Sequence, residues 1–348
     1  ASFTRTGDGD VVSAPMWAFR FNRNGRTFGL NTSASGLHPD FQAQSGFIRR
    51  NGIARANVTP RYTHYGKEGS ILETWTGSIS LDGIWRYGRF TDGKFPDDAR
   101  IHFNSGWLLK GGWSFTHSVL RESFLFDESL FSSYYVEKQE NGVAADTVKF
   151  VGQRRVPNLD FLFTINTPRF QKFGGRILFV MGPDTDFFEW AQTKSTILVF
   201  LNMDWRPTQK LRFDIDYTHQ QYLRSTDGST SFRRMIPRLK AEYQLTRALF
   251  VRLVAEYQAF FRDDLRDSAG NSDPILFYNS GDDTFARASK IRSNDFRVDW
   301  LVSYRPTPGT VAFFGYGSSL REPRSFRFQE FERLNDGFFI KLSYLFRS

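Results

Sequence analysis

The stretch DGFFIKLSYLFRS, residues 336–348, decides the fold. From Phe338 to Phe346 every second residue is apolar, while Lys341 and Ser343 stand between them. Such alternation predicts a β-strand, because successive side chains of a strand point to opposite faces. Whether the apolar face contacts a protein core or lipid depends on the rest of the chain.

The composition is unusual for a soluble globular protein. Of 348 residues, 38 are Phe, 13 Tyr and 8 Trp, yet the mean hydropathy is −0.44. Aromatic and polar residues alternate over long stretches, and helix-period segments are nearly absent. The lack of Cys excludes disulfides and thiolate metal sites. The net charge of +9 is spread among acidic residues rather than clustered, so we do not expect nucleic acid as a partner.

No apolar run is long enough for a spanning helix, and the best is STILVFLNM at 195–203. A membrane location would therefore require a closed barrel. The first ten residues, ASFTRTGDGD, lack the apolar region of a signal peptide and begin like a strand. We expect residues 1–348 to be a single barrel domain, and to be the C-terminal part of a longer chain.

Period-two patterns recur along the whole chain, and most have about the length that a tilted spanning strand needs. They lie at 14–22, 27–37, 53–65, 70–87, 98–107, 111–125, 158–167, 173–183, 195–205, 210–224, 235–244, 248–261, 294–305, 310–320 and 336–348. With the N-terminal fragment they number about sixteen.

The connections between these segments alternate in length. Those inside 204–213, 242–250 and 303–313 are tight. The others are long and polar, at 88–97, 126–156, 184–194, 225–234, 262–293 and 321–335. Short periplasmic turns and long outer loops are typical of outer-membrane barrels. The sequence therefore predicts an all-β, antiparallel, up-and-down transmembrane β-barrel of about 16 strands in the bacterial outer membrane.

The two faces of the predicted strands differ in chemistry. Residues expected to line the lumen are Arg212, Asp214, Asp216, Arg238, Lys240, Glu242, Arg252, Glu256, Arg297, Asp299 and Lys341. Residues expected to face lipid are Phe213, Ile215, Tyr217, Leu253, Trp300, Ile340, Leu342, Tyr344 and Phe346. A soluble β-sandwich would also carry one polar face, but aromatic residues near strand ends favour the barrel: Trp85, Trp107, Trp205 and Tyr304.

Three sequence segments resemble those of a known family. They are HPDFQAQSGFIRRNGI (38–53), GSISLDGIWRYGRFTDG (77–93) and YRPTPGTVAFFGYG (304–317). Over roughly residues 10–345 the chain resembles the barrel region of a bacterial outer-membrane family of unknown function. In that family a carbohydrate-binding-like family 9 module precedes the barrel. The resemblance implies such a module upstream of residue 1.

Catalytic and metal motifs are scarce. His117 and Ser118 are adjacent on a predicted strand, so they point to opposite faces and cannot act together. We therefore expect no enzymatic activity and no cofactor. The acidic loop DDLRDSAGNSD (263–273) offers a calcium candidate formed by Asp263, Asp264, Asp267 and Asp273.

Two functions remain open at this stage. The first is a porin-like conduit for transport, whose lumen wall carries mixed charge. The second is an anchor or scaffold of a cell-surface complex, with the lumen closed by charge pairing or by a plug from loop 126–156 or 262–293. Expected partners are the lipid bilayer, lipopolysaccharide, the outer-membrane assembly machinery, and periplasmic or surface proteins.

Overall fold

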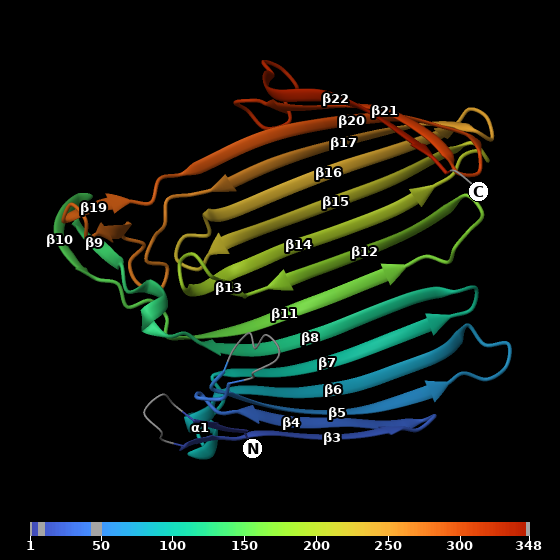
Figure 1. The fold of residues 1–348 in the computed structure, drawn as a ribbon. Coiled ribbons are helices and arrows are strands. Elements are labelled where there is room, and N and C mark those ends of the chain that lie inside the picture. Colours follow the sequence, from blue (N-terminus) through green and yellow to red (C-terminus); the bar gives the residue numbers. More distant parts are fainter. Residues whose placement is uncertain (1, 6–10, 43–50, 346–348) are drawn as a thin grey trace.

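A computed structural model describes the chain except for residues 1, 6–10, 43–50 and 346–348. A 16-stranded antiparallel sheet dominates it, and its strands follow one another in chain order (Figure 1). The strands along the path are β3 (Met16–Asn24), β4 (Phe28–Leu37), β5 (Ile53–Tyr65), β6 (Leu72–Arg86), β7 (Asp98–Leu109), β8 (Trp113–Leu125), β11 (Arg155–Asn166), β12 (Phe173–Gly182), β14 (Ala191–Trp205), β15 (Leu211–Arg224), β16 (Thr230–Gln244), β17 (Leu249–Arg262), β20 (Ile291–Thr307), β21 (Thr310–Arg321) and β22 (Glu332–Tyr344). The short strand β13 (Thr185–Asp186) pairs only with β14. The predicted all-β class with an antiparallel sheet of about 16 strands is confirmed.

The connections define two rims of this sheet. Short turns join β3 to β4, β5 to β6, β7 to β8, β11 to β12, β14 to β15, β16 to β17 and β20 to β21. They lie at one edge of the strands, here called the short-turn rim (Figure 1, right). The remaining connections lie at the opposite edge, here called the long-loop rim. The alternation read from the sequence therefore corresponds to a spatial separation.

The N-terminal fragment does not join the large sheet, so this part of the strand prediction is wrong. Strand β1 (Ser2–Arg5) instead pairs with β2 (Val11–Ala14) in a separate two-stranded sheet. The two segments are close in sequence, so they form a local hairpin at a small loop-closure cost.

The outer edges of β3 and β22 have no strand partner within the described part of the chain. Fifteen strands lie on the path, so β3 and β22 both run from the long-loop rim to the short-turn rim. A direct seam between them would therefore be parallel, whereas every other pair in the sheet is antiparallel.

The two longest loops form a structure of their own. Strands β9 (Tyr134–Glu140) and β10 (Val143–Lys149) come from one loop, and β18 (Ile275–Asn279) and β19 (Thr284–Arg287) from the other. They build a four-stranded sheet that projects beyond the long-loop rim (Figure 1, left). Phe131, Val136, Phe150, Leu265, Ile275 and Ala288 form its core. In the described structure, the apolar residues of these two loops, which were candidates for a plug, bury one another instead of entering the large sheet.

Two short helical turns complete the chain: α1 (Tyr87–Thr91) and the 3-10 helix η1 (Glu128–Phe131). Among the described residues, we find no helix with the length and apolar character that crossing a membrane would require.

Candidate functional site

The candidate site is the charged face of strands β14 to β22. In β15 and β16, Arg212 lies opposite Glu242, Asp214 opposite Lys240 and Asp216 opposite Arg238. The ladder continues through further pairs, because directly paired residues share a face: Glu242 with Arg252, Arg238 with Glu256, Glu256 with Arg297, and Asp299 with Gly317. Lys341 pairs with Phe313 on the same face of β21 and β22. All eleven residues predicted to line the lumen thus share one face.

Most of these charges are paired. Lys240 Nζ lies 3.2 Å from Asp214 and 3.1 Å from Glu242. Arg238 lies 3.4 Å from both Asp216 and Glu256. These side chains remain between a quarter and two fifths exposed, so each pair stabilises the fold by at most about 1 kcal/mol. The main effect of the ladder is therefore to keep this face hydrated and of mixed charge, and its contribution to the stability of the fold is small.

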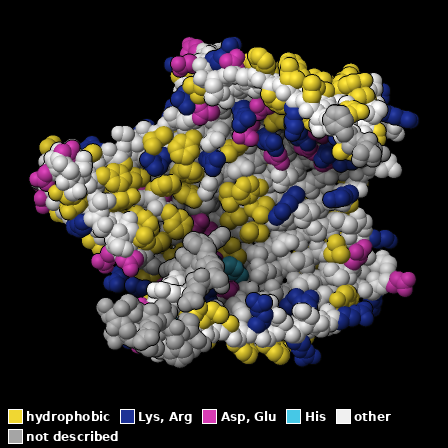
Figure 2. All heavy atoms as spheres, viewed as in Figure 1, with side chains coloured by type: hydrophobic (Ala, Val, Ile, Leu, Met, Phe, Trp, Pro, Cys, Tyr) yellow, Lys and Arg dark blue, Asp and Glu magenta, His cyan; other side chains and the backbone are white. Residues whose placement is uncertain are grey.

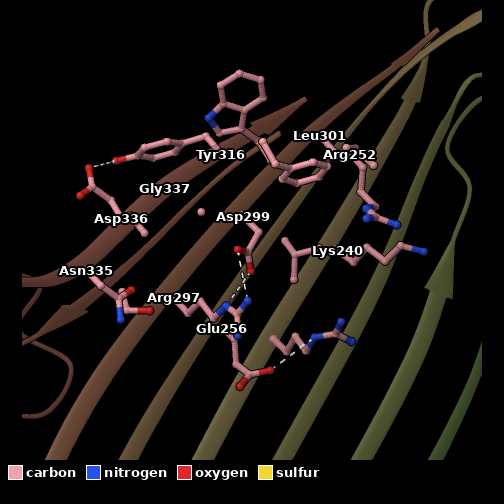
Figure 3. A pocket seen from close by; sticks show the side chains of 17 residues that line it. Lys240, Arg252, Glu256, Arg297, Asp299, Leu301, Tyr316, Asn335, Asp336 and Gly337 are labelled. Carbon is pink, nitrogen blue, oxygen red and sulfur yellow. Dashed lines mark hydrogen bonds and ion pairs between the residues drawn. The ribbon is translucent and has the colours of Figure 1, made fainter. Parts of the chain in front are cut away.

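Several cations of the inward face of β12 to β22 are unpaired in the described structure. The side chains of Arg176, Arg252 and Lys341 make no ion pair or hydrogen bond with other described residues, and Arg176 lies opposite Asn202 on the same face. Arg252 borders a cavity of about 950 Å³ whose other lining residues include Lys240, Glu256 and Asp299 (Figure 3). Figure 2 shows charged side chains of both signs gathered in the hollowed face of the sheet. This surface is open to solvent and carries positive charge that the protein does not neutralise.

The opposite face of the same strands is apolar. Phe213, Ile215, Tyr217, Leu253, Trp300, Ile340, Leu342 and Tyr344 all lie on it. The exposed fraction is 39% for Leu253, 67% for Ile340 and 77% for Leu342. Phe346 lies outside the described residues. Large apolar side chains exposed over a whole sheet face require an apolar medium around them.

The charged face continues into a half that is richer in neutral polar residues, which we did not predict. From β4 to β11 the inward positions are mostly hydroxyls and amides, among them Asn31, Ser33, Thr59, Thr63, Ser78, Asn104, Ser118 and Thr164. Ser118 donates to Asn104 at 2.7 Å, and Asn57 donates to Asp82 at 2.6 Å. The signal was present in the sequence as small polar residues at alternate positions of LNTSAS (30–35).

The histidines do not form a nucleophile–base arrangement. His117 lies on the apolar face and stacks on Phe163 with ring centroids 6.1 Å apart, whereas Ser118 points to the other face. His102 lies on the inward face, 2.6 Å from Glu122. This His–Glu pair also escaped sequence reasoning, because the two residues come from different strands.

The structure gives the calcium candidate no support, since basic groups already pair with most of its carboxylates. Asp263 binds Arg224 at 2.8 Å and Lys290 at 2.9 Å, and Asp264 binds Arg266 at 3.5 Å. Asp273 pairs with Lys138, and Asp267 accepts backbone contacts in its own turn. Within the described ranges, no group of three or more His, Cys, Asp or Glu side chains could hold a metal.

Arg224 instead forms a clasp at the long-loop rim that joins three loops. It makes two-pronged hydrogen bonds with Glu189, the shortest at 2.7 Å, and it donates to Asp263 and to the Asp264 carbonyl. Burial raises the pKa of Glu189, and Arg224 opposes that shift. Burial also acts to raise the pKa of Asp263, but hydrogen bonds from Arg224 and Lys290 outweigh it and lower the pKa to about 2.

No family model and no curated protein sequence matches the chain. Solved structures with a similar arrangement include the porin NanC, with 9% identity, a TM-score of 0.27, and coverage of 72% of this chain and 94% of that one. They also include the Vibrio cholerae outer-membrane protein OmpT. Its trimer form has 7% identity and a TM-score of 0.30, and the match covers 96% of this chain and 99% of that one. Its outer-membrane expressed form has 6% identity and a TM-score of 0.29, and the match covers 93% of this chain and 99% of that one.

The location of the chain follows from the sheet itself. Its strands are long enough to span a bilayer when tilted, its outer face is apolar, and aromatic residues lie near the strand ends. Antiparallel β-structure of this kind belongs to the bacterial outer membrane, and this is where the protein resides.

Proposed function

We propose that the protein is a porin-like conduit, in which the sheet closes into a barrel and its charged face surrounds an aqueous channel. The observation that carries this proposal is the inward ladder of exposed charges, together with an open cavity bordered by the unpaired Arg252. A face built only to stabilise a closed core would be dry and fully paired. The outward projection of the long loops, which leaves the sheet face uncovered by them, also supports an open channel.

Closure is part of this proposal. Unpaired N–H and C=O groups on a strand edge cannot face hydrocarbon, so β3 and β22 each need a partner in the membrane. A barrel of about sixteen strands leaves an aqueous lumen. The channel wall would then have one half rich in hydroxyls and amides and one more densely charged half, which suits small hydrophilic solutes with weak charge selectivity.

The second candidate is an anchor or scaffold in a surface complex. The feature that favours it is the four-stranded sheet outside the long-loop rim, whose edge strands β10 and β19 each pair on one side only in the described structure. Such edges can accept a strand from a partner protein. We propose no catalytic role, because no serine hydroxyl forms a hydrogen bond with a histidine among the described residues.

The family and its partners are also proposals. We propose that the chain belongs to the outer-membrane family it resembles, with a carbohydrate-binding-like module before the barrel. We further propose that the assembly machinery recognises β22, and that lipopolysaccharide surrounds the apolar face at the long-loop rim. The alternating pattern of 336–348 supports the first of these two interactions.

Reversing the unpaired cations should change the ion selectivity of the channel. In the variant Arg176→Glu, Arg252→Glu, Lys341→Glu, the cation-to-anion permeability ratio should rise several-fold, because each change adds negative charge to the wall without breaking a described ion pair. The reversal potential under a KCl gradient in planar bilayers measures this ratio. The charge-conserving variant Arg176→Lys, Arg252→Lys, Lys341→Arg is the control. Equal reversal potentials for the two variants would contradict the proposed lumen.

A further inference from the structure

The short-turn rim is strongly basic. Every short connection carries at least one Lys or Arg in it or beside it, and all of these side chains are exposed: Arg26, Lys67, Lys110, Arg169, Lys172, Arg206, Lys210, Arg247 and Arg305. We call them the turn cations. Glu68 is the only acidic residue within these connections. In the long loops, by contrast, acidic residues outnumber basic ones.

Most turn cations lack an acidic partner. The ammonium groups of Lys67, Lys110, Lys172 and Lys210 have no ion pair within the described structure. Only Arg206 is paired, with Asp204 at 2.9 Å. Figure 2 shows basic side chains spread along the edge where these turns lie. Positive charge that the protein does not neutralise is available to a ligand.

A band of aromatic residues lies next to the turn cations, on the apolar face. Ring centroids are 6.3 Å apart for Tyr62 and Trp75, and 6.1 Å apart for Trp75 and Trp107. Elsewhere along the rim, Trp205 stacks on Phe213 at 5.3 Å. Aromatic rings of this kind mark the boundary between hydrocarbon and headgroups. The turn cations therefore lie at the depth of the headgroups.

We infer that the turn cations bind the phosphate groups of anionic phospholipids in the leaflet at the short-turn rim. The charge is distributed over all the turns rather than gathered in one patch, which suits lipids that encircle the protein better than a single protein partner. Between two neighbouring turns the rim is concave, with a cavity of about 900 Å³ whose lining includes Lys172, Arg206 and Lys210. Long basic side chains extend readily from such a rim to headgroups. The inference needs the membrane location but not an open channel.

Spin-labelled lipids test this inference directly. In phosphatidylcholine vesicles at low salt, the protein should prefer spin-labelled phosphatidylglycerol over spin-labelled phosphatidylcholine by about fivefold, the factor expected from one favourable contact between a cation and an anionic membrane surface. The variant Lys67→Gln, Lys110→Gln, Lys172→Gln, Lys210→Gln should show a preference near unity. High salt should reduce the preference of the unaltered protein in the same way.

The control removes the same number of lysines at or near the long-loop rim: Lys94→Gln, Lys138→Gln, Lys149→Gln, Lys194→Gln. Its preference should stay at the level of the unaltered protein. Equal loss in both variants, or no preference in the unaltered protein, would overturn the inference. So would binding of soluble polyglutamate that depends on the turn cations without any lipid preference, since this would assign them to an acidic polypeptide. If the fourfold variant does not fold, the two double variants Lys67/Lys110 and Lys172/Lys210 should each lose part of the preference.

Discussion

Leu253→Arg should abolish assembly of the protein in the membrane, whereas Val254→Arg should leave it intact. The two residues are neighbours near the middle of the apolar part of β17, so they share one depth but point to opposite faces. Leu253 lies between Ala241 and Trp300 on the apolar face, and an arginine there costs about 2–4 kcal/mol near the bilayer midplane. Val254 borders the charged cavity beside Asp299, where an arginine gains an acidic neighbour.

The fraction of protein that migrates as the heat-modifiable folded band measures this difference. We expect that band to be lost for Leu253→Arg and retained for Val254→Arg. If both variants assembled equally well, or if Val254→Arg were the worse of the two, the apolar face would not face lipid. A water-soluble β-sandwich would then be the better description of the sheet.

Arg224→Ala should release the loops at the long-loop rim while the large sheet stays folded. Its guanidinium is almost fully buried against Glu189 and Asp263, and removing it leaves the buried Glu189 carboxylate without its cation, while Asp263 keeps only Lys290 and the more distant Arg266. Breaking a buried ion pair in this way costs about 3–5 kcal/mol. Because cleavage tracks the population of opened loops, protease should cut loop 263–290 about 10²- to 10³-fold faster.

The matched control is Arg266→Ala in the same cluster. Arg266 is about one-third exposed, and its ion pairs with Asp263 and Asp264 are 3.5 Å or longer, so cleavage should change little. In the Arg224 variant, acid should partly restore protection. The reason is that burial already raises the pKa of Glu189, and a carboxyl whose folded pKa is raised favours the folded state as the pH falls. Identical cleavage of both variants would mean that Arg224 does not hold the loops.

The strands and their faces could be predicted because each strand carries its own local signal. Residues 53–65 and 310–320 match β5 and β21 closely, and all eleven predicted lumen residues share one face. Period-two alternation assigns each side chain to one of the two faces, and this assignment does not require knowing which strand lies beside it. The short turns also predict which strands are neighbours, because two strands joined by a short connection must pair in antiparallel fashion.

What escaped prediction depends on contacts between distant segments. The four-stranded sheet joins β9 to β18, which lie more than 130 residues apart, and neither loop shows an alternation long enough to suggest it. Arg224 meets Glu189 and Asp263 only once three loops converge. The sequence therefore suggested Asp263 as a calcium ligand, because its partners Arg224 and Lys290 are distant from it along the chain. The hydroxyl- and amide-rich half of the inward face carries fewer charges than the other half, so its pattern was less conspicuous in the sequence.

Single-channel recording in planar lipid bilayers tests the central claim most directly. The purified, heat-modifiable protein should insert and produce discrete, long-lived conductance steps in KCl, with weak selectivity between cations and anions, because the inward face has mixed charge and the long loops do not cover it. A protein that is folded and inserted but never conducts would contradict the conduit and leave the anchor as its function.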